Sequence, residues 1–199
     1  MNDQRERYAL SFTTGGLLER EAAVLALVYA EHRDWRKVRD VAVEGNLLQT
    51  RTYRTGVRLV RETVKRMSAL EDREVEIIAE VTAAERGHLM WAAACRRYDL
   101  IGEFAEEVLR ERFLTLAGTV AYEDYDSFYR AKAMWHDELD SISAATYKKL
   151  RQVLFKMMVE AGLLTTMGAI EPALLSARIA ECLTERTPSD IRFFPTREA

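Results

Sequence analysis

Five cationic residues recur along one stretch of the chain at intervals of three or four positions: Arg51, Arg54, Arg58, Arg61 and Lys65. This spacing stacks side chains on one face of an α-helix. Like charges in such a row repel one another unless an anion lies against them, and the planar fork of arginine suits phosphate oxygens. We call this pattern the cationic stripe. It indicates a site for a polyanion, and we expect nucleic acid.

The stripe contrasts with the charge of the whole chain. Between Leu47 and Leu70 there are six basic residues, including Arg66, and a single acid, Glu62. The segment has a net charge of +5 in a chain whose formal total is −3, so the remaining residues sum to −8. The alternative is a solvated or protein-docking face, on which the arginines pair with carboxylates from the acid-rich stretches 71–85 and 103–111.

The residues before the stripe resemble a helix-turn-helix. A short helix that Asp34 caps and a Gly45-Asn46 turn lead into the stripe helix, predicted over about 49–69. In that motif the second helix enters the major groove with its first turns. We therefore expect Gln49, Arg51 and Arg54 near base edges, and Arg58, Arg61 and Lys65 along phosphates.

A second basic surface is predicted on the helix that Ser143 caps, which continues to about Ala161. Its cations would widen the nucleic-acid footprint, although a solvated helix face explains them equally well. They are Lys148, Lys149, Arg151 and Lys156.

The apolar periodicity predicts an all-α bundle of about nine helices in one domain, residues 1–199, with a possible division into 1–70 and 71–199. The first expected helix has about four turns, includes Leu17–Val28 and follows a cap at Thr13 or Thr14. Besides the helices named above, five more are expected over 71–83, 84–98, 102–116, 125–139 and 172–184. The apolar side of the stripe helix should be buried, and it consists of Tyr53, Val57, Val60, Val64 and Met67. A small hairpin over 163–170 would give the C-terminal part a winged-helix character, and the tail with Ile191, Phe193 and Phe194 should pack on the core.

Composition narrows the function classes. The chain has 48% hydrophobic and 31% charged residues, and its longest uncharged apolar run, 22–30, is too short to cross a bilayer. No secretory signal precedes the first helix, so we expect a cytoplasmic protein with reduced Cys95 and Cys182. No phosphate-loop, His-Glu-x-x-His, Cys-x-x-Cys or Gly-x-Ser-x-Gly motif is present. We therefore predict a non-enzymatic protein without a cofactor, a metal site or catalytic residues.

Several segments, in this order, resemble the BrxA family of the BREX bacteriophage-exclusion systems. They are Ser11-Phe12-Thr13-Thr14-Gly15-Gly16-Leu17-Leu18, Asn46-Leu47-Leu48-Gln49 with the arginine helix ending in Lys65-Arg66-Met67, Trp91 through Arg96-Arg97-Tyr98, and Thr146-Tyr147-Lys148-Lys149-Leu150-Arg151 leading to Glu160-Ala161-Gly162-Leu163-Leu164. The resemblance implies a NusB-like helical accessory protein that binds double-stranded DNA in a phage-defence system, with the other components of that system as partners. It carries over no catalytic residue.

Two alternatives to duplex DNA remain. A NusB-like fold also suits RNA, although RNA loops are usually read by exposed aromatic residues and Tyr53 is predicted on the apolar side. The protein could instead be a scaffold whose basic helix docks an acidic protein partner.

Overall fold

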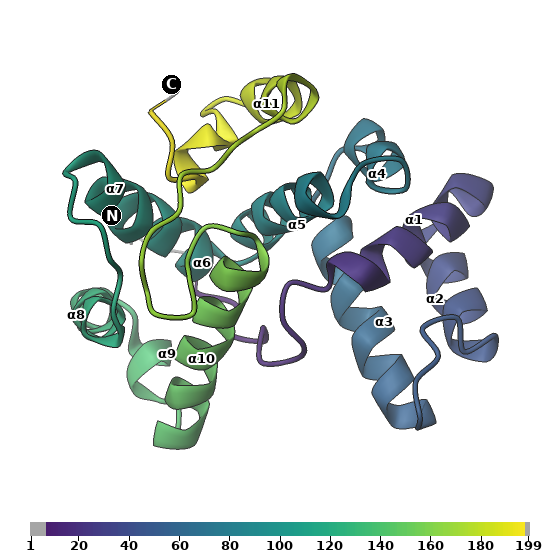
Figure 1. Ribbon diagram of the computed structural model, residues 1–199. Helices are drawn as coiled ribbons and strands as arrows, with labels where there is room; N and C mark the ends of the chain where they lie inside the picture. Colours follow the sequence, from purple (N-terminus) through teal and green to yellow (C-terminus); the bar gives the residue numbers. More distant parts are fainter. Residues whose placement is uncertain (1–6, 198–199) are drawn as a thin grey trace, which may run out of the picture.

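Six other helices pack around α5, Ala83–Arg97, which the sequence predicts to be central because it is apolar nearly all round. The computed structural model describes residues 7–197, and in it every residue from Leu89 to Cys95 is buried. Helix α5 contacts α1, α3, α4, α6, α10 and α11 (Figure 1). It begins with a capping box, in which the Thr82 hydroxyl accepts from the Glu85 amide and the Glu85 carboxylate accepts from the Thr82 amide.

The N-terminal helices gather at one end of the molecule (Figure 1). They are α1 (Glu19–His32), α2 (Trp35–Glu44), α3 (Tyr53–Met67) and α4 (Asp72–Ile78). Asp34 caps α2 as predicted, since its carboxylate accepts from the Arg36 amide at 2.7 Å. The predicted cap of the first helix at Thr13 or Thr14 is wrong. Leu18 precedes α1 with a left-handed φ of 64°, so the helix cannot extend further back.

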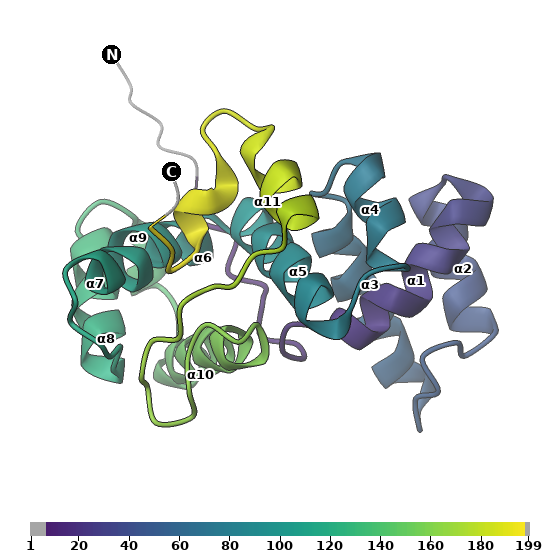
Figure 2. The ribbon, with the colours of Figure 1, turned by 45° about the horizontal axis from the view of Figure 1, so that its top comes forward.

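The opposite end is built from the helices that follow α5 (Figures 1 and 2). They are α6 (Asp99–Phe104), which continues through a π-helical stretch (Ala105–Arg110) into α7 (Glu111–Leu114), then α8 (Tyr122–Ala133), α9 (Asp137–Asp140) and α10 (Ala144–Glu160). The helix predicted over 125–139 is therefore two helices. Ser143 caps α10 as predicted, with its hydroxyl 3.1 Å from the Thr146 amide.

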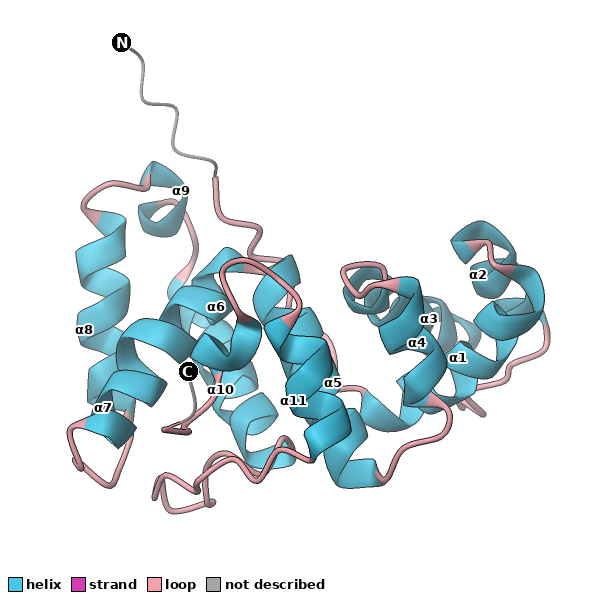
Figure 3. Cartoon of the chain, turned by 90° about the horizontal axis from the view of Figure 1, so that it is seen from above, coloured by secondary structure: helices cyan, strands magenta, loops and turns pink. Residues whose placement is uncertain are grey.

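The C-terminal part covers α5 with α11 (Ala177–Thr184) and a 3-10 turn (Asp190–Phe193) (Figure 3). Pro172 lies ahead of this last helix rather than in its first turn, but the predicted burial of Ile191, Phe193 and Phe194 is confirmed. The two cysteines are buried free thiols. Among the described residues, segment 163–170 forms only isolated bridges, Leu164 with Ile170 and Ala169 with Thr119, and no strand. The all-α class is confirmed.

An extended N-terminal segment, residues 7–18, joins the two ends before α1 begins (Figures 1 and 2). At one end the Tyr8 hydroxyl donates to Glu103 at 2.6 Å, and the Tyr8 amide donates to Glu138 at 2.7 Å. Further along, the fully buried Phe12 ring packs against Tyr98, with 5.2 Å between the ring centroids. The segment is thus partly buried, with Tyr8, Phe12 and Leu17 in the core.

Arg66 holds this segment against α3 from inside the protein. Its side chain is fully buried and forms an ion pair with Glu62 one turn back, at 3.0 Å. Its Nη1 group donates to the carbonyl oxygen of Gly16 at 2.5 Å and contacts the carbonyl oxygen of Leu17 at 3.3 Å. The Tyr98 hydroxyl donates to the same Glu62 carboxylate at 2.7 Å. The charges of this buried pair are therefore compensated by each other and by neutral dipoles.

We predict that Arg66→Met lowers the free energy of unfolding by about 3–5 kcal/mol, because Glu62 is left as an uncompensated buried charge and two carbonyl groups lose their donor. Urea denaturation measures the change. Arg61→Met on the exposed face of the same helix is the matched control and should change stability by less than about 0.5 kcal/mol. Equal effects of the two substitutions would contradict the structural role of Arg66.

Burial, together with the hydrogen bond to Glu62, raises the pKa of Tyr98 to about 12. An unfolded tyrosine ionises near pH 10, so the folded state holds this proton more tightly. The stabilisation is fully present below about pH 10 and is lost as the pH rises toward 12. We expect the native protein to lose roughly 2 kcal/mol more stability across this window than Tyr98→Phe does, measured by urea denaturation at several alkaline pH values. Parallel pH profiles would refute the assignment.

Candidate nucleic-acid interface

The cationic stripe lies partly on α3 and partly in front of it. Helix α3 begins at Tyr53, after the cap Thr52, whose hydroxyl accepts from the Thr55 amide at 3.3 Å. Gln49 and Arg51 therefore lie in the loop before the helix, and the prediction that the helix starts at residue 49 is wrong. Arg54, Arg58, Arg61 and Lys65 do lie along one side of α3.

The loop before α3 has a defined conformation. The Asn46 side-chain oxygen accepts from the Thr50 amide at 3.0 Å, and its amide group donates to the Thr50 carbonyl oxygen at 3.2 Å. Asn46 and Gln49 both have left-handed φ angles, 44° and 48°. The backbone is therefore not helical at Gln49, where the sequence predicted the helix to begin. This connection over 45–52 is longer than the turn of about three or four residues that is typical of a helix-turn-helix.

The stripe faces solvent. Arg51, Arg54, Arg58 and Arg61 are exposed and Lys65 is half-buried, and within residues 7–197 none of the five lies in an ion pair. Two of them touch neutral groups of the N-terminal segment. Arg58 donates to the Thr14 hydroxyl at 3.2 Å, and Lys65 donates to the Ser11 hydroxyl at 2.7 Å. These contacts orient the two cations without neutralising their charge.

Most acids of the two stretches that could have paired with the stripe, 71–85 and 103–111, form ion pairs with other bases instead. Their ion pairs are Glu71 with Arg186, Glu74 with Arg96, Glu76 with Arg33, Glu80 with Arg178, Glu103 and Glu107 with Lys132, and Glu106 with Arg192. The single acid of the stripe segment, Glu62, is buried with Arg66. Because Glu62 and Arg66 cancel each other, the net charge of +5 in that segment comes from the five cations of the stripe.

Tyr53 lies outside the core. The sequence predicts it on the apolar side of α3, but it is the first residue of the helix and 76% exposed. Its ring has no aromatic, cation–π or hydrogen-bond partner among the described residues. The other predicted apolar positions, Val60, Val64 and Met67, are buried, and Val57 is half-buried. The Tyr53 ring is therefore open to a stacked base, contrary to the sequence prediction.

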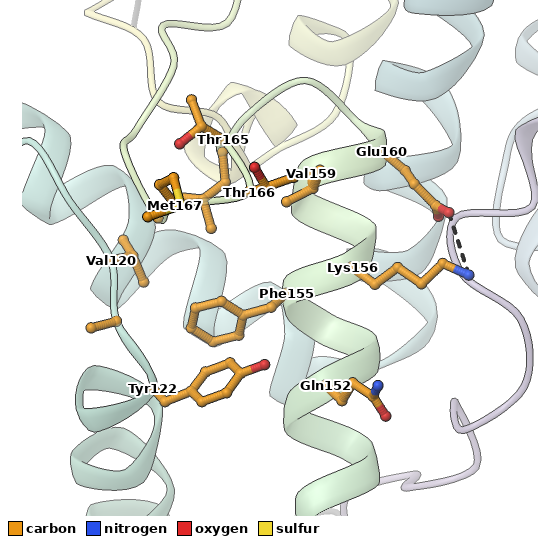
Figure 4. Close-up of a pocket in the computed structure, with 13 residues that line it drawn as sticks. Val120, Tyr122, Gln152, Phe155, Lys156, Val159, Glu160, Thr165, Thr166 and Met167 are labelled. Carbon is orange, nitrogen blue, oxygen red and sulfur yellow. Dashed lines mark ion pairs between the residues drawn. The ribbon is translucent and has the colours of Figure 1, made fainter.

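The second basic surface on α10 is less open than its sequence suggests. Arg151 pairs with Asp126 of α8 at 2.6 Å, and its guanidinium lies 4.3 Å from the centroid of the Tyr122 ring. Lys156 pairs with Glu160 at 3.5 Å, and Figure 4 shows both side chains turned toward the N-terminal segment, away from Phe155 and Tyr122. Lys148 and Lys149 are exposed and have no ion pair within residues 7–197.

The two basic surfaces do not form one continuous groove. A pocket of about 510 Å³ lies between Leu59 of α3 and Lys156 of α10, and Glu19, Glu21 and Glu160 all line it. The Glu160 carboxylate also accepts from the Leu17 amide at 2.6 Å. Three carboxylates and two bases, Arg20 and Lys156, therefore line the space between the two basic surfaces. The stripe is therefore the stronger candidate site.

No group of three or more His, Cys, Asp or Glu side chains within residues 7–197 is arranged to hold a metal ion. No helix in the same range is both long and apolar enough to cross a membrane. A separate pocket of about 630 Å³ beside α10 is lined mainly by apolar side chains, including Phe155 and Met167 (Figure 4).

The fold and the site define an all-helical protein with an exposed cationic face on one terminal bundle. A family model for BrxA matches residues 6–187, so the chain belongs to the BrxA family, as its motifs predicted, and is a member of a BREX phage-defence system. A BREX protein BrxA of Escherichia coli O9:H4 (strain HS) is 24% identical over 76% of this chain and 71% of its own length. Another from Bacillus cereus (strain H3081.97) is 23% identical over 73% and 74%.

A solved structure shares the fold. The crystal structure of an uncharacterized protein from Magnetospirillum magneticum has a TM-score of 0.73, with 20% identity, 94% coverage of this chain and 97% of its own. At this level of identity the likeness concerns the fold alone.

We predict that Arg151→Gln lowers the free energy of unfolding by about 1 kcal/mol, since it removes a partly exposed ion pair and a stacked guanidinium. Lys148→Gln, one turn away on the same helix, is the control and should leave stability within about 0.5 kcal/mol. Both are measured by urea denaturation. Equal stability of native protein and Arg151→Gln would show that this arginine is free to bind a ligand.

Proposed function

We propose that this protein binds double-stranded DNA through the cationic stripe, without catalysing a reaction on it, as an accessory component of its phage-defence system. The observation that carries the proposal is the absence of ion pairs for all five cations within residues 7–197, although the neighbouring stretches are rich in acids. A row of unpaired cations can neutralise phosphates and release the cations condensed on the DNA, which favours binding.

The contacts of the stripe divide into two groups in this proposal. The five cations of the stripe follow the phosphate backbone, Arg51 from the loop before α3 and the other four from the exposed side of the helix. Gln49 approaches base edges from the same loop. Lys148 and Lys149 add a weaker, separate contact, and the cytoplasm is the compartment in which we place the complex.

The salt dependence of binding tests the proposal. If five phosphates are neutralised, log K against log salt on duplex DNA should have a slope of about −4.5. The double variant Arg54→Glu with Arg58→Glu should bind at least about tenfold more weakly, with a slope nearer −2.7 as two contacts are lost. Fluorescence anisotropy with a labelled blunt duplex at several salt concentrations gives both quantities.

The matched control is Arg130→Glu with Lys37→Glu, because these two bases are exposed, have no ion pair within residues 7–197, change the net charge equally and lie on other helices. It should retain nearly native binding. If both double variants lose binding equally, the net charge of the protein and not the stripe determines affinity. If neither variant loses binding, the stripe is not the DNA site.

RNA is a second candidate because Tyr53 is exposed, contrary to the sequence prediction. Competition between a DNA duplex and an RNA of matched sequence distinguishes the two ligands. In a scaffold role, the stripe would instead dock an acidic component of the defence system. Co-purification of such a protein that survives nuclease treatment, and that the Arg54→Glu with Arg58→Glu variant abolishes, would favour that role.

A further inference from the structure

A groove between α2 and α3 opens directly beside the stripe. It has a volume of about 490 Å³, which lies within the range of small-molecule pockets. Its walls combine the apolar side chains of Val57 and Val60 with the exposed ring of Tyr53. Figures 1 and 2 show α2 and α3 side by side at the end of the molecule. Arg61 belongs to both the groove and the stripe, so a ligand that follows the stripe passes the mouth of the groove.

The charged residues of the groove are of both signs. Arg36 and Arg39 from α2 line it with Arg61, and so do Asp40 and Glu44. Within residues 7–197 none of these five side chains lies in an ion pair. A phosphate alone would contact the three arginines and leave the two carboxylates without a donor. A nucleobase suits the carboxylates, since its amino groups donate hydrogen bonds to them.

Tyr53 supplies the remaining element of such a site. An exposed tyrosine without a ring partner offers a flat surface on which a base can stack. Arg54, the next residue of α3, is an exposed cation of the stripe. A base in a duplex is already stacked and paired, so only an unpaired base can use both the ring and the carboxylates.

We propose that the α2–α3 groove receives an unpaired DNA base, which stacks on Tyr53 while its phosphate lies on the stripe. This inference rests on the proposed function and adds to it a preference for DNA with a single-stranded end or junction over a blunt duplex. Asp40 and Glu44 accept hydrogen bonds from the amino groups of the base, and Arg36 and Arg39 lie beside the phosphate that follows.

Binding of two labelled DNAs that share one duplex tests the proposal, one blunt and one with a single-stranded overhang of about four nucleotides. The native protein should bind the overhang DNA at least about fivefold more tightly, which is the effect of stacking one base. Tyr53→Ala should abolish this preference and change binding of the blunt duplex by less than twofold. Tyr53→Trp should retain it. An overhang with abasic sugars keeps the phosphates and should bind no better than the blunt duplex.

Two matched controls separate the groove from its surroundings. Leu27→Ala removes an exposed apolar side chain of α1 and should leave the preference intact. Arg39→Gln should reduce the preference, whereas Lys37→Gln, on the same helix but outside the groove, should not. Circular dichroism of each variant checks that it is folded.

The outcomes are distinct for the two proposals. Equal binding of the blunt, overhang and abasic DNAs overturns the groove proposal and leaves DNA binding by the stripe in place. Loss of all binding in the Arg54→Glu with Arg58→Glu variant, together with an unchanged overhang preference in Tyr53→Ala, also overturns it. A stronger preference for an RNA overhang of the same sequence overturns the assignment to DNA. Absence of any nucleic-acid binding by the native protein overturns both proposals.

Discussion

The buried pair of Arg66 and Glu62 determines how the rest of this end of the protein is arranged. An arginine without exposure to solvent is stable only if its donors are used, and here they reach a carboxylate and the carbonyl groups of Gly16 and Leu17. The extended segment before α1 is therefore fixed to the inner side of α3. Because the segment also binds Glu103 and Glu138 through Tyr8, it connects the two ends of the molecule.

This arrangement explains why the stripe is open. The inner sides of α3 are covered by the segment and by the core, which buries Glu62, Val64 and Arg66. The remaining cations stay on the solvent side, where their only described partners are the hydroxyls of Ser11 and Thr14. Elsewhere the acids bind bases of neighbouring helices, as in the buried contact of Arg96 with Glu74 and Asp190. The separation of charge along the sequence thus becomes a separation of charge in space.

The sequence predicts the helices well and the side chains near their ends less well. The caps Asp34 and Ser143 and the burial of Leu89–Cys95 follow from local patterns, and the structure confirms them. The start of α3 depends on the left-handed angles at Asn46 and Gln49, which no periodicity reveals. Arg66 and Arg151 look like surface cations in the sequence, but Arg66 is buried against the carbonyl oxygen of Gly16 and Arg151 pairs with Asp126 of α8. The stripe could be identified because regular spacing is a local property, whereas contacts between distant segments are not.

The position of Tyr53 shows how a small shift in a helix boundary changes the chemistry of a surface. A tyrosine in the second turn of a longer helix would pack on α2 with Val57 and Val60. As the first residue of α3 it has no preceding turn to cover it, so its ring stays in solvent beside Arg54. The end of α3 therefore presents an apolar ring next to a cation, and helix α2 adds carboxylates a short distance away. A purely electrostatic face for duplex phosphates needs only the cations. The ring and the carboxylates have a role when one base leaves the stack of the duplex. The face of that base can then stack on Tyr53, and its amino groups can donate hydrogen bonds to the carboxylates.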